Sequence, residues 1–232
     1  MRFDVVTIFP QFFDSLRLSK IWRNAQDSRL IELFVHDLRN YARDKHRSVD
    51  DTPFGGGPGM VMKVEPLVEV IETLPKLSER KVLYASPQGR KLSQSWAFEL
   101  AQSSQLVVVA GRYEGVDERF VEGWVDESFS VGDYVLSGGE LPCMVLLEVV
   151  ARLLPGVVGN WESVASDSFT SGVLKFPQYT RPAEFRGRKV PEILQSGNHE
   201  AIRRWREEQS RLRTIGRRPD LLKREKEERN EV

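Results

Sequence analysis

The chain of 232 residues is long enough for one large domain or for a domain with a small satellite. With 40% hydrophobic and 29% charged residues and no apolar run of bilayer-spanning length, it is expected to be soluble and not a membrane protein. The N-terminal residues lack the pattern of a secretory signal, which predicts a cytoplasmic protein. The single cysteine, Cys143, excludes an internal disulfide and is expected to be a small buried side chain.

The net charge of zero hides an asymmetry between the two ends of the chain. Residues 1–158 carry 18 basic and 22 acidic side chains, whereas residues 159–232 carry 16 basic and 12 acidic ones. Residues 175–218 alone hold 12 basic and 5 acidic side chains. Phosphate is one natural counterpart of such a local excess of positive charge.

Apolar runs of strand length alternate with segments of helical periodicity along the first two thirds of the chain. The expected strands are residues 3–9, 30–35, 81–85 and 106–110. The expected helices are residues 18–26, 65–74, 93–102 and 139–154. This order predicts an α/β domain with a mainly parallel sheet.

A domain boundary is expected at residues 155–160, which contain proline and glycine and mark the change in charge balance. Beyond it, a helix is expected from residue 198 to about residue 216. Trp205 lies among the arginines of this helix and could stack on a nucleic-acid base. It shares an apolar stripe with Ile202 and Leu212, however, which favours a position in the core.

The glycine cluster at residues 50–60 is either a flexible loop or a backbone segment that closely approaches a ligand or another backbone. It is not a P-loop, because no Gly-Lys-Ser/Thr follows it. Three other segments, residues 86–89, 111–115 and 131–140, are expected where strands end. Open α/β sheets bind ligands at the carboxyl ends of their strands, so these segments could form one pocket. Strands of any α/β protein also end in glycine-containing turns, so spacing alone does not name a ligand.

Two charged residues near the boundary allow more than one interpretation. Arg152 lies four residues after Glu148, a spacing that permits an ion pair on one helix. Asp167 could equally be a helix N-cap. The three histidines are scattered without the spacing of a metal site and are expected to be structural.

Five motifs, taken in order, resemble those of a known family. They are Asp-Asp-Thr-Pro-Phe-Gly-Gly-Gly-Pro-Gly-Met (50–60), Ser-Pro-Gln-Gly (86–89), Gly-Arg-Tyr-Glu-Gly-Val-Asp-Glu-Arg (111–119), Gly-Asp-Tyr-Val-Leu-Ser-Gly-Gly-Glu-Leu-Pro (132–142) and Arg-Leu-Leu-Pro-Gly-Val-Val-Gly (152–159). With them the chain closely resembles the bacterial tRNA (guanine-N1)-methyltransferases from its N-terminus to about residue 220, and Tyr-Thr-Arg-Pro (179–182) fits the same family. The departures are small: Phe54 stands where a tyrosine is common, and Ala165-Ser166 stand where an acidic residue is frequent.

The resemblance implies a SPOUT-class fold, in which the mainly parallel α/β domain contains a deep trefoil knot and is followed by a small helical C-terminal domain. By this resemblance residues 1–158 form the domain that binds S-adenosylmethionine, residues 159–170 a linker, residues 171–222 a helical tRNA-binding domain and residues 223–232 a charged flexible tail. It further implies an obligate homodimer with each active site across the interface. The implied methyl acceptor is the guanine immediately 3′ of the tRNA anticodon.

The resemblance also assigns site residues. The residues implied at the S-adenosylmethionine site are Ser86, Pro87, Gly111, Tyr113, Gly115, Val131, Gly132, Asp133, Tyr134, Val135, Leu136, Gly138 and Gly139. Asp167 and Arg152 are the implied catalytic pair: a carboxylate can remove the proton from guanine N1, and a guanidinium can stabilise the charge that then builds on O6. Glu114 could hold Mg²⁺ or orient the base, and the sequence leaves both roles open.

Two rival functions are weighed against this one. A non-catalytic RNA-binding module with the same fold is disfavoured because the chain keeps both Asp167 and Arg152. A methyltransferase of the same class could instead act on ribosomal RNA or on a ribose. Transcripts with and without guanine after the anticodon would distinguish these activities.

Overall fold

The computed structural model describes residues 1–159 and 161–222. Its tertiary contacts divide the chain into two compact units, the first of which is Met1–Gly159. The second unit comprises the described residues from 161 onward. The expected tail, residues 223–232, lies outside the described residues.

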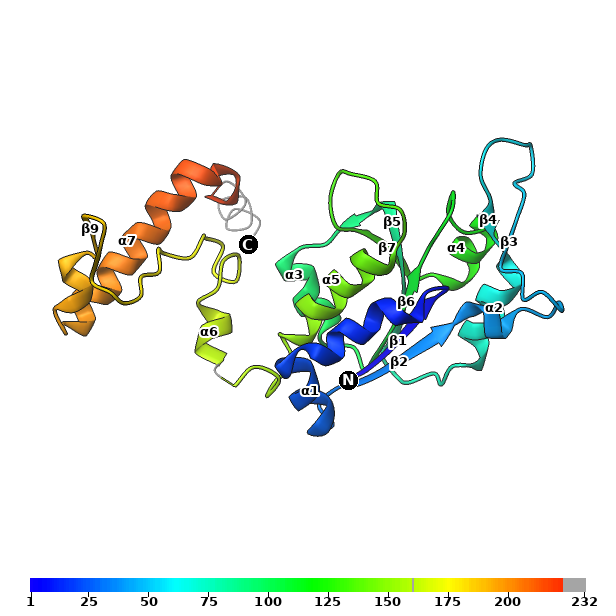
Figure 1. Ribbon diagram of the computed structural model, residues 1–232, viewed down its shortest axis with the longest axis horizontal. Coiled ribbons are helices and arrows are strands. Elements are labelled where there is room, and N and C mark those ends of the chain that lie inside the picture. Colours follow the sequence, from blue (N-terminus) through cyan, green and yellow to red (C-terminus); the bar gives the residue numbers. More distant parts are fainter. Residues whose placement is uncertain (160, 223–232) are drawn as a thin grey trace, which may run out of the picture. The chain divides into compact units, whose positions relative to one another are not determined.

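The first unit is built on a parallel sheet of five strands in the order β2-β1-β6-β5-β7 (Figure 1). Its strands are β1 (Arg2–Thr7), β2 (Glu32–Asp37), β5 (Arg80–Lys91), β6 (Gln105–Ala110) and β7 (Glu127–Ser130). The expected α/β class with a mainly parallel sheet is therefore confirmed. The sequence did not predict β7, because it has only four residues, of which Glu127 and Ser128 are half-exposed.

Helices cover both faces of this sheet (Figure 1). They are α1 (Lys20–Asp27), α2 (Val64–Thr73), α3 (Gln94–Leu100), α4 (Glu118–Trp124) and α5 (Glu140–Ala151), with 3₁₀ helices η1 (Pro10–Leu18) and η2 (Leu38–Tyr41). The sequence predicted α1, α2, α3 and α5 but not the short α4, which begins at an N-cap formed by Asp117. The first expected helix is correct only from Lys20, because the residues before it form η1.

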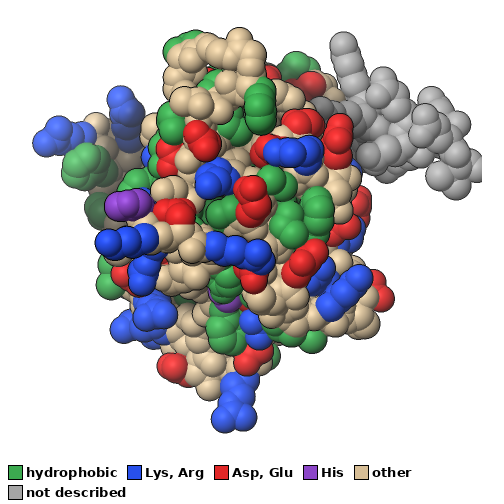
Figure 2. Space-filling view, turned by 90° about the vertical axis from the view of Figure 1, so that its right-hand side faces the viewer, with side chains coloured by type: hydrophobic (Ala, Val, Ile, Leu, Met, Phe, Trp, Pro, Cys, Tyr) green, Lys and Arg blue, Asp and Glu red, His purple; other side chains and the backbone are tan. Residues whose placement is uncertain are grey.

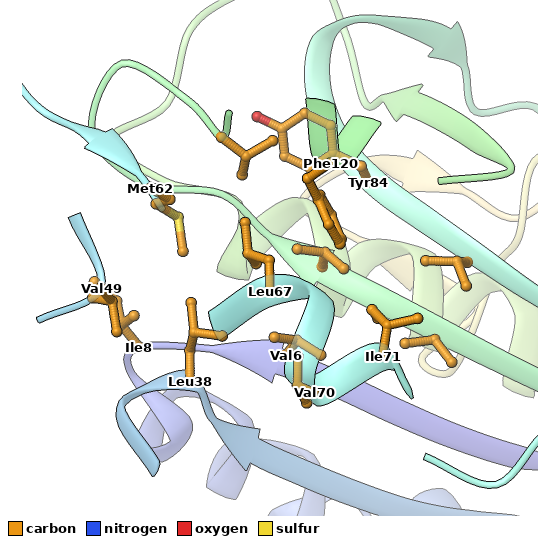
Figure 3. Close-up of a cluster of buried hydrophobic side chains, with 14 of the residues drawn as sticks. Val6, Ile8, Leu38, Val49, Met62, Leu67, Val70, Ile71, Tyr84 and Phe120 are labelled. Atoms are coloured by element: carbon orange, nitrogen blue, oxygen red, sulfur yellow. The ribbon is translucent and has the colours of Figure 1, made fainter. Parts of the chain in front are cut away.

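A continuous apolar core fills the space between the sheet and helices α2 and α4 (Figure 3). Val6 of β1 packs there with Leu67 and Ile71 of α2 and with Phe120 of α4. The neighbouring residue in β1, Val5, is also fully buried, although its side chain points to the opposite face. Burial on both faces explains why the strands read as unbroken apolar runs. Cys143 of α5 is buried, as expected.

One polar network is buried in this sheet. Asp4 of β1 is fully buried and accepts hydrogen bonds from Arg2 (2.7 Å) and Gln105 (2.8 Å), and His36 Nε2 lies 2.9 Å from its carboxylate. Burial alone would raise the pKa of Asp4, but the hydrogen bonds from His36, Arg2 and Gln105 outweigh burial and lower the pKa to about 2. The carboxylate is thus a structural charge.

The second unit contains helix α6 (Trp161–Ala165), a hairpin of β8 (Glu184–Phe185) and β9 (Arg188–Lys189), the 3₁₀ helix η3 (Glu192–Gln195) and helix α7 (His199–Arg217). Helix α6 lies within residues 159–170, the segment expected to link the two domains. Trp205 of α7 is half-buried, but Leu212 on the expected core stripe is 54% exposed, and Ile215 further along α7 is 49% exposed. The stripe is therefore only partly covered within this unit.

The surface of the first unit mixes both signs of charge. Seen from the side of β3, β4 and α2, basic and acidic side chains alternate with apolar ones (Figure 2). In the part of the chain that the structure describes, no helix is both long enough and apolar enough to cross a membrane.

Candidate active site

The three glycine-containing segments meet beside strands β5, β6 and β7. Residues 111–115 follow β6, and residues 131–139 connect β7 to α5. Residues 86–89 were expected to follow the end of a strand, but β5 continues through them to Lys91. They form an irregularity inside β5, which pairs with β7 up to Ala85 and again from Arg90. The strand resumes after this excursion, and Ser86, Pro87 and Gln88 of the excursion lie beside the other two segments.

These segments line a pocket of about 470 Å³. Twelve of the thirteen residues assigned by resemblance to the methyl-donor site line it: Ser86, Pro87, Gly111, Tyr113, Gly115, Val131, Gly132, Tyr134, Val135, Leu136, Gly138 and Gly139. Asp133 does not line it, because its side chain is 92% exposed and pairs with Lys91 Nζ at 3.1 Å. The pocket volume lies in the range typical of small-molecule sites.

Two glycines allow backbone segments to come close together here. The amide of Gly139 donates a hydrogen bond to the carbonyl of Gly111 at 2.8 Å. A Cβ atom on Gly139 would lie 2.8 Å from Ala110 Cα and from Gly111 N, nearer than side-chain carbons approach backbone. A Cβ atom on Gly111 would lie 2.8 Å from the ring of Tyr84. Larger residues would push these segments apart and change the shape of the pocket.

A buried ion pair holds two of the pocket segments together. Glu140, the first residue of α5, is 1% exposed and accepts hydrogen bonds from Thr7 Oγ1 (2.9 Å) and Arg112 Nε (2.8 Å). Arg112 also donates to the carbonyl of Ser137 at 3.1 Å, and its guanidinium lies 4.6 Å from the ring centre of Phe9. Arg112 thereby ties the exit of β6 to the segment that precedes α5.

Sequence reasoning missed this bridge. Arg112 and Glu140 both stand in quoted motifs, but they are 28 residues apart. No helical or strand periodicity relates residues at that separation. Tyr84, which packs against Gly111 and lines the pocket, was missed because it lies within an apolar strand.

The glycine cluster lies next to the same pocket. Its flanks form the hairpin of β3 (Asp50–Asp51) and β4 (Val61–Met62), and the amide of Met62 donates to the carbonyl of Gly115. Gly59 has a positive φ of 83°, and a Cβ atom there would lie 2.3 Å from Glu114 Oε1. By contrast, Gly55–Gly57 have open space around them. The cluster thus combines a close approach to the Glu114 side chain at Gly59 with an open tip, while its flexibility stays a prediction.

Two further groups at this edge bear on acid–base chemistry. Burial, followed by the nearby charge of Asp50, raises the pKa of Tyr113, so this phenol remains protonated at neutral pH. Glu114 also lines the pocket. Among the residues that the structure describes, no group of three or more histidine, cysteine or acidic side chains could hold a metal ion.

The two residues assigned to catalysis belong to different compact units. Arg152 follows the last residue of α5 in the first unit, is half-buried and donates its amide hydrogen to the carbonyl of Glu148. The carboxylate of Glu148 accepts a hydrogen bond from the indole of Trp22. Asp167 follows α6 in the second unit, where Lys175 Nζ lies 2.8 Å from its carboxylate.

Comparison with known proteins identifies the family. The family model described as tRNA (Guanine-1)-methyltransferase TrmD matches residues 1–224. A tRNA (guanine-N(1)-)-methyltransferase of Moorella thermoacetica is 52% identical over 227 residues, which are 97% of this chain and 91% of that protein. The proteins of the same name from Pseudomonas putida and Ruminiclostridium cellulolyticum are 50% and 48% identical over 224 residues, which are 96% of this chain and 90% and 96% of those proteins. The chain therefore belongs to the tRNA (guanine-N1)-methyltransferase family.

Proposed function

We propose that this protein transfers a methyl group from S-adenosylmethionine to N1 of the guanine immediately 3′ of the anticodon in tRNA. The observation that carries the proposal is the convergence of three glycine-containing segments on one pocket in a chain of this family. The alternative function, a non-catalytic RNA-binding module, would not require such a pocket. A cytoplasmic location is part of the proposal, since tRNA is the substrate.

The size and the lining of the pocket support S-adenosylmethionine as the methyl donor. Its wall combines backbone of the glycine segments with the rings of Tyr113 and Tyr134. Backbone amides and carbonyls can bond the polar edges of an adenosine, while the rings and Leu136 provide apolar contact for the base. The donor supplies a methyl group already activated on a sulfonium, so the protein needs no nucleophile of its own. Its task is to align the reacting atoms and to exclude water.

The proton of guanine N1 is the chemical obstacle, since N1 is a poor nucleophile while it carries that proton. Asp167 is proposed as the general base, a contribution of roughly 10²–10⁴-fold in rate. Its ion pair with Lys175 orients the carboxylate. Arg152 is proposed to stabilise the negative charge that develops on O6, an effect of about 3–4 kcal/mol for one well-placed donor.

A trefoil knot is proposed for the segment between β6 and α5. The hydrogen bond from Gly139 to Gly111 shows these segments in direct backbone contact, as a chain threaded tightly past β6 requires. In this proposal residues 1–158 are the methyl-transfer domain, residues 159–170 connect it to the next, and residues 171–222 grip tRNA. The 12 basic side chains against 5 acidic ones in residues 175–218 suit an RNA ligand.

A homodimer is proposed, with each active site shared between subunits. The support is a set of exposed apolar side chains on η1, α1 and α5, and η1 packs against both α1 and α5. These residues are Phe12, Leu18, Ile21, Leu141 and Val145, with exposed fractions from 38% to 81%. Such a patch is typical of a surface covered by another protein. We propose that a second copy of the chain covers this patch, and that Asp167 of one subunit serves the pocket of the other.

Methyl transfer to defined transcripts tests the proposal. Purified protein, radiolabelled S-adenosylmethionine and two tRNA transcripts are needed, one with guanine after the anticodon and one with adenine there. Methylation of the guanine transcript alone is expected. Equal methylation of both transcripts, or methylation of ribosomal RNA but of neither transcript, would contradict the proposed acceptor. Donor binding without methylation of any RNA would favour the non-catalytic module.

A further inference from the structure

The second unit contains a cleft of its own, of about 550 Å³, between α7 and the segment before it. Its inner wall includes Phe176, Val190 and Leu194, which are half-buried. Its rim carries Tyr179, 48% exposed, and the exposed guanidinium groups of Arg181 and Arg206. An apolar wall with a ring and two cations at the rim is an amphipathic site of small-molecule size.

Arg206 differs from the arginines beside it on α7. Arg203 and Arg204 form ion pairs with glutamates one turn away, Glu207 (3.8 Å) and Glu200. The guanidinium of Arg206 instead lies 4.8 Å from the ring centre of Phe176. Throughout residues 1–159 and 161–222, no carboxylate lies within ion-pair distance of Arg206 or Arg181. Two cations at the rim of one cleft therefore lack an anion.

We propose that this cleft holds one nucleotide of the substrate RNA, outside the pocket where the reacting guanine is methylated. The base stacks on the exposed ring of Tyr179, a contact that tolerates any base because every base has a π face. The flanking phosphates bind Arg206 and Arg181, whose planar donor groups match phosphate oxygens. Gln178, Thr180 and Gln195 line the same cleft and can bond the edge of the base.

The chemistry of the cleft favours RNA over an acidic peptide. Carboxylates would satisfy the two guanidiniums, but they would leave the ring of Tyr179 and the apolar wall without a flat partner. A single nucleotide, by contrast, carries both a phosphate for the guanidiniums and an aromatic face for the ring. The inference rests on the proposed function insofar as the RNA is tRNA. It also distinguishes between the arginines of α7: Arg206 should contribute more to RNA binding than Arg203.

Four variants test the cleft. Arg206→Gln removes an unpaired cation, and Arg203→Gln is its matched control on the same helix. Tyr179→Leu removes the stacking ring, and Tyr179→Phe keeps it. The affinity for a tRNA transcript is measured by fluorescence anisotropy over a range of salt concentrations, with affinity for S-adenosylmethionine and thermal unfolding as controls for folding.

Arg206→Gln is expected to weaken tRNA binding by about tenfold and to reduce the slope of log affinity against log salt by about 1. Tyr179→Leu is expected to weaken binding at least fivefold without changing that slope, because stacking releases no counterions, while Tyr179→Phe keeps wild-type affinity. The cleft is refuted if Arg206→Gln behaves like Arg203→Gln, or if folded Tyr179→Leu binds like wild type. If the wild-type protein binds the donor but neither binds nor methylates tRNA, the proposed function fails as well. If the wild-type protein methylates tRNA but these variants leave tRNA affinity unchanged, the cleft alone is refuted.

Discussion

Replacing Glu140 with alanine should loosen the pocket from within the first unit. The carboxylate is 1% exposed and accepts hydrogen bonds from Thr7 and Arg112, so its loss leaves a buried hydroxyl and a guanidinium without their acceptor. Removing one partner of a buried pair typically costs 3–5 kcal/mol. The side chain of Arg112 is 17% exposed and can partly turn to solvent, which places the expected loss at about 3 kcal/mol, the low end of this range.

Two measurements check this prediction. Urea unfolding should show the loss of stability, and calorimetry should show weaker binding of S-adenosylmethionine, because the segment before α5 is no longer tied to the exit of β6. Glu122→Ala, on the exposed face of α4, is the matched control and should change stability by less than about 0.5 kcal/mol. If Glu140→Ala unfolds like this control and keeps wild-type donor affinity, the bridge does not hold the pocket.

Three further predictions concern chemistry, assembly and pH. Asp167→Ala should lower the single-turnover rate by roughly 10²–10⁴-fold while leaving donor affinity nearly intact, and a near-wild-type rate at neutral pH would move the base elsewhere. Mixed dimers of Asp167→Ala with Gly139→Trp should regain up to half of wild-type activity, since one of the two shared sites is then intact; no recovery after confirmed subunit exchange would refute a shared site. The pKa of Asp4 is about 2 in the folded protein and 3.8 ordinarily, so its charge stabilises the fold above pH 3.8 and the benefit is lost as pH falls through 2. Asp4→Asn should therefore lower the free energy of unfolding in urea by about 2 kcal/mol at pH 5. The variant should also lose less stability than wild type between pH 4 and pH 2, and an identical pH dependence of the two proteins would contradict this.

The sequence predicted those parts of the fold that repeat with a regular period. Helices α2 and α5 and strands β1 and β6 were foreseen, because an apolar stripe or an unbroken buried run identifies each. Strand β7 and helix α4 were too short for a period to develop. The excursion inside β5 was read as the end of a strand, since proline and glycine suggest a turn equally in both cases.

The candidate site was foreseen mainly through resemblance to a family, and only partly through physical reasoning. Position after a strand predicted a pocket, but no local rule distinguishes its lining residues from those of an ordinary turn. The pairing of Arg112 with Glu140 depends on tertiary folding and is invisible in spacing. The sequence places glutamates one turn from Arg203 and Arg204 but not from Arg206. The packing of Arg206 on Phe176, by contrast, depends on tertiary folding and could not be read from spacing.

Locating the new methyl group decides whether N1 of the guanine beside the anticodon is the acceptor. A full-length tRNA transcript is incubated with the protein and S-adenosylmethionine, cut with a base-specific ribonuclease, and analysed by liquid chromatography and mass spectrometry. We expect 1-methylguanosine, confined to the fragment that contains the nucleotide 3′ of the anticodon. A methyl group on a ribose, on another guanine atom or in any other fragment would contradict it.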